Sequence, residues 1–309
     1  MRFLAALIAM WFATAASGQN LTFESISELA RKTAAGSLTN EQFWDAIGIV
    51  PGLFYCSHDC AVSRQDVGRF GSDAGQDELV KIIQQDYSRF LLLHSVNDAS
   101  TLVAYVDAGE SRYNPAEAKT ILSGGKLWLQ IKTYPRGGTG LALFPSDWYE
   151  LYQNRFRRVL SIPSEGHMVN GDPARGFEIR FLRGETAGEI EMLKFVYSVD
   201  FFSGSGSGGA SIDIDLWQNE GVVTFSRPKG QAVFEFDPRR SEMSKEFVDF
   251  IFSYEGADEF KFYRLLSEHL LEIARNPRDR RREWLRQLLD RETSVPSLEP
   301  VRKAFANAR

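Results

Sequence analysis

The chain has 309 residues, of which 43% are hydrophobic and 25% charged, and its formal net charge is -5. This composition is that of an ordinary globular protein and excludes long disorder, collagen-like sequence and a bare coiled coil. Because the net charge is small and negative, we expect no nucleic-acid partner. The sequence holds no Walker, HExxH, GxSxG or kinase motif, and we predict no cofactor.

The first 18 residues have the pattern of a secretory signal peptide. Arg2 supplies a positive charge, an apolar run of about eleven residues follows it, and small residues precede Gln19. The run is shorter than the roughly 20 residues that a membrane-spanning helix needs. We expect cleavage before Gln19 or after Ala16, with a retained N-terminal anchor as the alternative. The mature protein is then periplasmic or secreted and has no transmembrane segment.

Residues 19–88 are predicted to form a helical N-terminal region. Thr39 and Gln42 have the spacing of a capping box, which indicates that a short helix begins there. Apolar residues close to a 3.6-residue period predict an amphipathic helix over 77–87. The stretch 57–76 between them is rich in Gly, Asp and Ser and is predicted to be a loop.

Residues 89–240 are predicted to form the sheet core, with strands from about 89 to 237. Apolar and polar residues alternate here, for example from Leu193 to Phe201, as an antiparallel sheet requires when one face meets the core and the other meets water. Within this region we expect two hairpins, at 89–107 and 220–236, and two inserted helices, one beginning at Asn114-Pro115 and one over 146–160.

Residues 241–309 return to helical periodicity, with three apolar stripes. The predicted fold class is therefore α+β, a largely antiparallel sheet packed against N-terminal and C-terminal helices. We expect residues 19–309 to form one compact unit.

Cys56, His58 and Cys60 form the one dense cluster of reactive groups. Two cysteines four residues apart can close a disulfide, and in an oxidising compartment this is the favoured interpretation. An exchange-active disulfide and a copper(I) site with His58 as third ligand are the alternatives.

Single histidines and paired carboxylates are the weak catalytic candidates. His167 lies with Glu165 in a predicted Gly/Pro-rich loop, where catalytic residues are common, and His94 lies in a predicted strand. Asp213 and Asp215 occur two residues apart in a strand and so share one face, where paired carboxylates can perform acid–base chemistry. That face is also where solvated side chains are expected.

The last 35 residues hold ten Lys and Arg and five Asp and Glu, a net charge of +5. An anionic partner could bind this basic region, or the region could dock on the protein's own acidic body, which we favour. The candidate patch for an anionic partner is Arg278, Arg280, Arg281, Arg282 and Arg286.

The sequence favours a binding or accessory role, with an unknown protein or envelope partner, over catalysis. The first alternative is a secreted hydrolase that uses a histidine–carboxylate pair, since catalytic groups can converge from distant positions. The second alternative is a thiol-redox or copper-handling protein that uses Cys56, His58 and Cys60.

Overall fold

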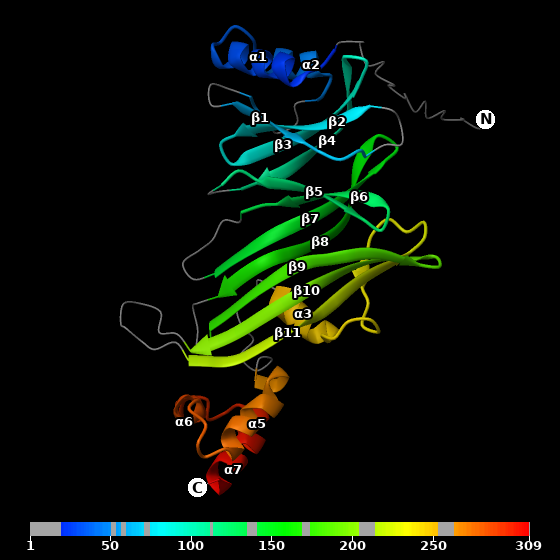
Figure 1. The fold of residues 1–309 in the computed structure, drawn as a ribbon. Coiled ribbons are helices and arrows are strands. Elements are labelled where there is room, and N and C mark those ends of the chain that lie inside the picture. The colour runs from blue at the N-terminus through cyan, green and yellow to red at the C-terminus, as the bar shows by residue number, and fades with distance from the viewer. Residues whose placement is uncertain are drawn as a thin grey trace, which may run out of the picture. The chain divides into compact units, whose positions relative to one another are not determined.

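The computed structural model describes residues 20–50, 54–56, 60–70, 75–111, 114–134, 141–168, 174–203, 214–252 and 263–308 (Figure 1). Residue contacts divide the chain into two compact units. The first unit takes in the described residues up to Gln85, together with Arg89–Asp107, and the second takes in Asp86–Ser88 and Ala108 onward. The expected signal peptide lies outside the described residues, and the expectation of one compact unit stays a prediction.

The first unit is a four-stranded antiparallel sheet with two helices on one face (Figure 1). Its core brings Phe43 and Trp44 of a helix against Val80 and Leu91 of the sheet. The elements in chain order are α1 (Phe23–Ala34), α2 (Asn40–Ile47), β1 (Ala61–Asp66), β2 (Gln76–Gln84), β3 (Tyr87–Val96) and β4 (Ala99–Glu110).

The predicted capping box is confirmed at the start of α2. The Thr39 hydroxyl accepts from the Gln42 backbone N–H at 3.2 Å, and the Gln42 side chain accepts from the Thr39 N–H at 2.9 Å. The predicted hairpin near 89–107 is also confirmed, because β3 and β4 are neighbours joined by a turn with positive φ at Asn97 and Asp98.

The helix predicted over 77–87 is wrong. This stretch contains β2, which lies between β1 and β3, and β1 itself falls in the predicted loop 57–76. Val80, Ile82 and Ile83 are β-branched, and such side chains are restricted in helices but pack well on a pleated surface. The apolar spacing alone did not distinguish these two outcomes.

The second unit is built on an eight-stranded antiparallel sheet in the order β12-β11-β10-β9-β8-β7-β6-β5. The middle strands are 12 to 15 residues long, and short turns at 153–154 and 188–189 join β7 to β8 and β9 to β10. The strands are β5 (Glu117–Ser123), β6 (Lys126–Lys132), β7 (Leu141–Tyr152), β8 (Arg155–Met168), β9 (Ala174–Ala187), β10 (Ile190–Ser203), β11 (Ile214–Pro228) and β12 (Glu235–Phe236).

Both helices predicted inside the sheet region are wrong. Asn114 and Pro115 precede β5, and the stretch 146–160 is the hairpin of β7 and β8. The turn of that hairpin has positive φ at both Gln153 and Asn154, as a type I′ hairpin turn requires. Apolar residues on both sides of this turn are spaced three to four positions apart, as in a helix, although the chain reverses direction between them.

Helix α3 packs on the apolar face of the eight-stranded sheet, and the antiparallel sheets with helices towards both ends of the chain confirm the α+β class. Phe247 of α3 packs edge-on against Trp217 of β11, with 5.5 Å between ring centroids, and the same core continues to Trp284. The helical segments are α3 (Lys245–Phe252), α5 (Ser267–Arg275), α6 (Arg282–Arg291), the short 3-10 helix η1 (Pro296–Leu298) and α7 (Glu299–Asn307). Among the described helices, none is both long enough and apolar enough to cross a membrane.

The sheet forks between β8 and β9. In the described part of the chain these strands pair where Glu165–Met168 lies opposite Arg175–Glu178, and beyond Glu178 strand β9 separates from β8. The tip of the β5–β6 hairpin reaches β9 instead, where the Gly184 N–H donates to the Ser123 hydroxyl at 2.7 Å. The sheet therefore curls, and the fork borders two surface hollows: β7, β8, β9 and β10 line one, and β5, β6 and β9 line the other.

Candidate functional site

A groove on the outer face of the sheet gathers polar side chains from three adjacent strands. Cross-strand register places them in two neighbouring rows, because residues two apart on a strand share one face. The first row is Glu165, Glu178 and Ser198, and the second is His167, Gly176 and Asp200. These six residues line one hollow of about 410 Å³, together with Phe144, Gly166 and Phe177.

Gly176 creates much of this hollow. It lies between His167 and Asp200 in the second row, and a Cβ built on it would have no atom within 4 Å. The missing side chain thus leaves open space between a histidine and a carboxylate. A larger residue at position 176 would fill the groove without a backbone clash.

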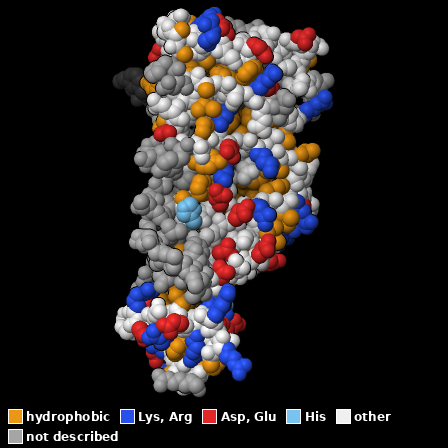
Figure 2. Space-filling view, turned by 60° about the vertical axis from the view of Figure 1, so that its left-hand side comes forward, with side chains coloured by type: hydrophobic (Ala, Val, Ile, Leu, Met, Phe, Trp, Pro, Cys, Tyr) orange, Lys and Arg blue, Asp and Glu red, His pale blue; other side chains and the backbone are white. Residues whose placement is uncertain are grey.

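The carboxylates of the groove differ in whether a basic side chain lies nearby. Lys132 Nζ lies 3.1 Å from Glu165, and Arg180 lies 3.6 Å from Glu178 and 4.0 Å from Glu220. Within the described chain, Asp200 has no ion-pair partner. Acidic and basic side chains lie side by side on the face drawn in Figure 2. The groove therefore has a local negative charge at Asp200.

Tyr134 lies next to this groove and remains protonated. Its hydroxyl donates to Glu117 at 2.6 Å. This hydrogen bond, together with burial and the nearby charges of Glu117 and Glu165, raises the pKa of Tyr134 to about 12. Lys132 Nζ lies 5.5 Å from the Tyr134 ring centroid and 5.3 Å from that of Phe144. Tyr134 can donate a hydrogen bond at neutral pH but cannot act as a base.

The structure brings the predicted candidates His167 and Glu165 into this groove. Both belong to β8, although the sequence placed them in a loop. The His167 ring lies 6.3 Å from the Phe144 ring, centroid to centroid. Among the described residues, no hydrogen bond joins His167 to a carboxylate.

Among the described residues of the first unit, His94 forms the one close histidine–carboxylate contact. Its Nδ1 lies 2.7 Å from Asp77 Oδ1, and Asp77 also accepts from the Phe70 N–H at 2.6 Å. Asp77 is buried, and the Gly75 backbone packs against the imidazole so closely that a Cβ there would lie 2.6 Å from Nε2. This pair holds the segment before β2 against β3.

The predicted carboxylate pair at the start of β11 is described only in part. Asp213 lies outside the described residues. Asp215 is exposed, pairs by register with Phe202 of β10 and does not line the groove.

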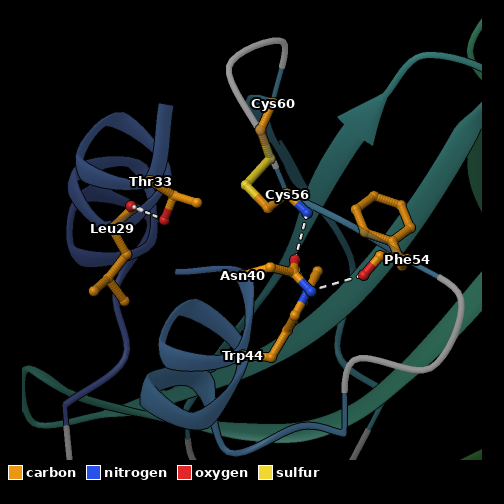
Figure 3. The surroundings of a disulfide bond; sticks show 7 residues. All are labelled: Leu29, Thr33, Asn40, Trp44, Phe54, Cys56 and Cys60. Carbon is orange, nitrogen blue, oxygen red and sulfur yellow. Dashed lines mark hydrogen bonds between the residues drawn. A yellow bond between two sulfur atoms is a disulfide. The ribbon is translucent and has the colours of Figure 1, made fainter. Parts of the chain in front are cut away.

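The predicted disulfide between Cys56 and Cys60 is present, with 5.2 Å between their Cα atoms (Figure 3). Asn40 Oδ1 accepts from the Cys56 N–H at 2.7 Å and from Trp44 Nε1 at 3.0 Å. Trp44 Nε1 also donates to the Phe54 carbonyl at 3.1 Å. The disulfide therefore belongs to a packed local network that ties the segment after α2 to that helix.

The bridged form of this pair offers no thiolate to a metal, because both sulfurs are used in the bond. His58 lies outside the described residues. Among the described residues, no three His, Cys, Asp or Glu side chains are grouped to hold a metal ion. The copper alternative stays a prediction for the reduced form.

The basic C-terminal region uses several of its arginines internally. Arg281 pairs with Asp279 at 2.6 Å and donates to the Leu216 carbonyl at 3.0 Å. The Arg282 guanidinium lies 3.9 Å from the Phe305 ring centroid, and Arg286 pairs with two acidic residues of its own helix. Arg278 and Arg280 are exposed and have no ion-pair partner in the described chain.

Sequence reasoning missed four residues of the groove: Gly176, Glu178, Ser198 and Asp200. The alternation of β9 and β10 predicts that the last three lie on the solvent face, and it gives no sign that they adjoin one another across strands. Only the register between strands shows that they adjoin His167.

Models of known protein families give no match to the chain, and a search of curated proteins finds no match either.

Proposed function

We propose that the protein is an exported, non-catalytic binding protein and that the groove lined by Glu165, His167, Gly176, Glu178 and Asp200 holds its ligand. The observation that carries this proposal is the hollow itself, which three strands line in register. Ligand sites are concave and combine apolar walls with a few placed polar groups, and this hollow combines both. Its position on long paired strands makes its shape rigid.

The charge at Asp200 defines the ligand class. Glu165 and Glu178 have basic neighbours, whereas Asp200 has none within the described chain. A ligand with an amine can pair with Asp200 while its apolar part lies against Phe144. The ligand is therefore a small cationic molecule or a basic side chain.

Phenethylamine tests this proposal, with phenylethanol as the neutral probe of similar shape. We expect the amine to shift the NMR signals of groove residues and the alcohol to leave them unchanged. Asp200→Asn should lower amine affinity about tenfold, the size of one charge-assisted contact. Asp215→Asn is the matched control, since Asp215 is an exposed carboxylate outside the groove.

Filling the groove is the second arm of this test. Gly176→Leu should abolish amine binding and leave the thermal unfolding midpoint nearly unchanged, because position 176 has space for a Cβ. Thr186→Leu places the same side chain on an exposed position of the same strand and should bind like the parent. Equal amine binding by Gly176→Leu would contradict the assignment of this groove.

Export is supported by the N-terminal signal pattern and by the disulfide, which persists in oxidising compartments. The mass and N-terminal sequence of the protein recovered from its host check this part. We expect a chain that begins near Gln19 and carries the disulfide.

The hydrolase alternative has one specific observation in its favour. Ser198, His167 and Glu165 line the same groove, and these residue types form nucleophile, base and orienting group in many hydrolases. Ester hydrolysis that is lost in both Ser198→Ala and His167→Ala would favour this alternative over the binding role.

A further inference from the structure

The second hollow of the sheet lies between two strand edges that have no partner strand among the described residues. β5 is the last strand of the eight-stranded sheet, so one of its edges has no described partner. Beyond Glu178, no strand of the described chain pairs with β9 on the side away from β10. In the described chain, the hydrogen bonds that join these two edges are those between Ser123 and Gly184. We call the hollow between them the β5–β9 seam.

The seam has an apolar floor and a basic rim. It has a volume of about 460 Å³, and its lining residues are Lys119, Thr120, Ile121, Gln130, Ile179, Arg180 and Phe181. Phe181 continues into the core, where its ring lies 4.9 Å from that of Trp148. Lys119 is exposed and has no ion-pair partner among the described residues, and no acidic residue lines the seam.

Two exposed leucines lie on the strands that border the seam. The exposed fraction is 75% for Leu122 of β5 and 47% for Leu182 of β9. Large apolar side chains at this exposure, next to unpaired strand edges, favour pairing with another extended chain. The main-chain groups of β5 supply hydrogen bonds, and the seam floor accepts alternate side chains.

We propose that the β5–β9 seam binds an extended polypeptide segment of a partner protein, which adds as a strand to the unpaired edge of β5. The segment carries apolar side chains towards Ile121, Ile179 and Phe181 and an acidic side chain towards Lys119, since Arg180 already lies beside Glu178 and Glu220. Strand addition of this kind gains affinity from main-chain hydrogen bonds and specificity from alternate side chains. This interaction is separate from amine binding in the outer groove.

A fluorescein-labelled short peptide that alternates valine with threonine and carries one aspartate is the probe. Fluorescence anisotropy should show saturable binding to the full mature protein. The same peptide with N-methyl groups on alternate residues loses its main-chain donors, and we expect it to bind about a hundredfold more weakly. Equal binding of the two peptides, or no binding of the unmodified one, would overturn the proposal.

Lys119→Glu tests the location of this site. Reversing this exposed charge should weaken peptide binding about tenfold, whereas Lys229→Glu, at an exposed lysine in the turn after β11, should not. Hydrogen exchange should slow on peptide addition at Lys119–Ile121 and Ile179–Phe181, and Gly176→Leu should bind the peptide as the parent does. Insensitivity to Lys119→Glu would contradict the site.

A second copy of the chain is the other possible occupant of an unpaired edge. Light scattering over a range of protein concentrations separates the two cases. Two results together would assign the edge to self-association and overturn the proposal: the protein forms a dimer that Lys119→Glu dissociates, and the peptide does not compete with that dimer. A monomer that binds the peptide supports it.

Discussion

Arg227 shows how the second unit holds a charge inside its core. Its side chain is only 3% exposed, and its guanidinium donates to Glu191 at 2.7 Å, to Glu150 at 2.5 Å and to the Ala232 carbonyl at 3.1 Å. Phe234 covers one face of the guanidinium, with 4.4 Å to its ring centroid. The cluster ties β7, β10 and β11 together where the sheet curls.

Removing the cation from this cluster leaves two partly buried carboxylates with less compensation. We therefore expect Arg227→Met to lower the free energy of unfolding by about 3–5 kcal/mol, as measured by urea denaturation. Arg286→Met is the control, because its ion pairs with Glu283 and Asp290 are exposed and each contributes less than about 1 kcal/mol. Similar losses in the two variants would contradict this account.

The same cluster predicts a dependence of stability on pH. Burial raises the pKa of Glu150, but hydrogen bonds and charge attraction from Arg227 and Arg157 outweigh it, so this pKa lies below its ordinary value of 4.5. Burial also raises the pKa of Glu191, but hydrogen bonds and charge attraction from Lys126 and Arg227 outweigh it, so this pKa is lowered as well. A lowered folded-state pKa stabilises the fold above the unfolded value and loses this effect as the pH falls through the folded one.

We therefore expect the free energy of unfolding to fall as the pH is lowered below about 4.5. Between neutral pH and pH 5 these two carboxylates should contribute almost no change. In Arg227→Met the carboxylates lose part of the attraction that lowers their pKa, so the gap between parent and variant should narrow in acid. Urea denaturation at a series of pH values checks this, and a constant gap would exclude the cluster as the cause.

At the scale of elements, the sequence predicted those strands and helices that alternation of apolar residues or a helix cap specifies locally. The strands of β9 and β10, the capping box at Thr39 and the C-terminal helices all follow from short-range pattern. The stretches 77–87 and 146–160 failed because apolar residues three to four apart also occur on strands and across turns. Gln153-Asn154 forms the turn of β7 and β8, and an Asn beside a polar residue was a weak signal for it.

The disulfide segment is an element stabilised by several contacts at once. Replacing Cys56 and Cys60 together by serine should lower the free energy of unfolding by about 2 kcal/mol, because a small closed loop restricts the unfolded chain only modestly. Urea denaturation with and without reductant measures this. The double variant is also the control for the reductant: reductant should lower the free energy of unfolding of the parent and leave that of the variant unchanged.

Intact mass with and without reductant checks the bond itself. We expect reduction to add the mass of two hydrogens to the mature parent protein. A copper adduct on two free thiols would instead support the metal alternative and contradict a structural role for this pair.

At the scale of the whole molecule, the candidate site depends on contacts that no local pattern encodes. Asp200 and His167 are 33 positions apart, yet register places both beside Gly176. Alternation identified the solvent face, but only the strand order identifies which polar residues on that face are neighbours. The β5–β9 seam depends in the same way on where β8 and β9 separate.

The C-terminal helices are part of the same core as the sheet of the second unit. Seven apolar side chains from α6 onward are buried in it: Trp284, Leu285, Leu288, Leu289, Val295, Leu298 and Val301. At roughly 1.5–3 kcal/mol for each buried side chain, their burial contributes more than about 10 kcal/mol. This equals the whole net stability of a typical domain.

Deleting residues 275–309 should therefore leave an aggregated or unfolded protein. Size-exclusion chromatography and circular dichroism of the truncated chain measure this. The double variant Arg278→Gln and Arg280→Gln is the control: it removes two exposed charges of the same region and should keep the parent's unfolding midpoint, because neither side chain has an ion-pair partner among the described residues. A truncated chain that stays monomeric and unfolds cooperatively would show that these helices are a separable tail rather than part of the core.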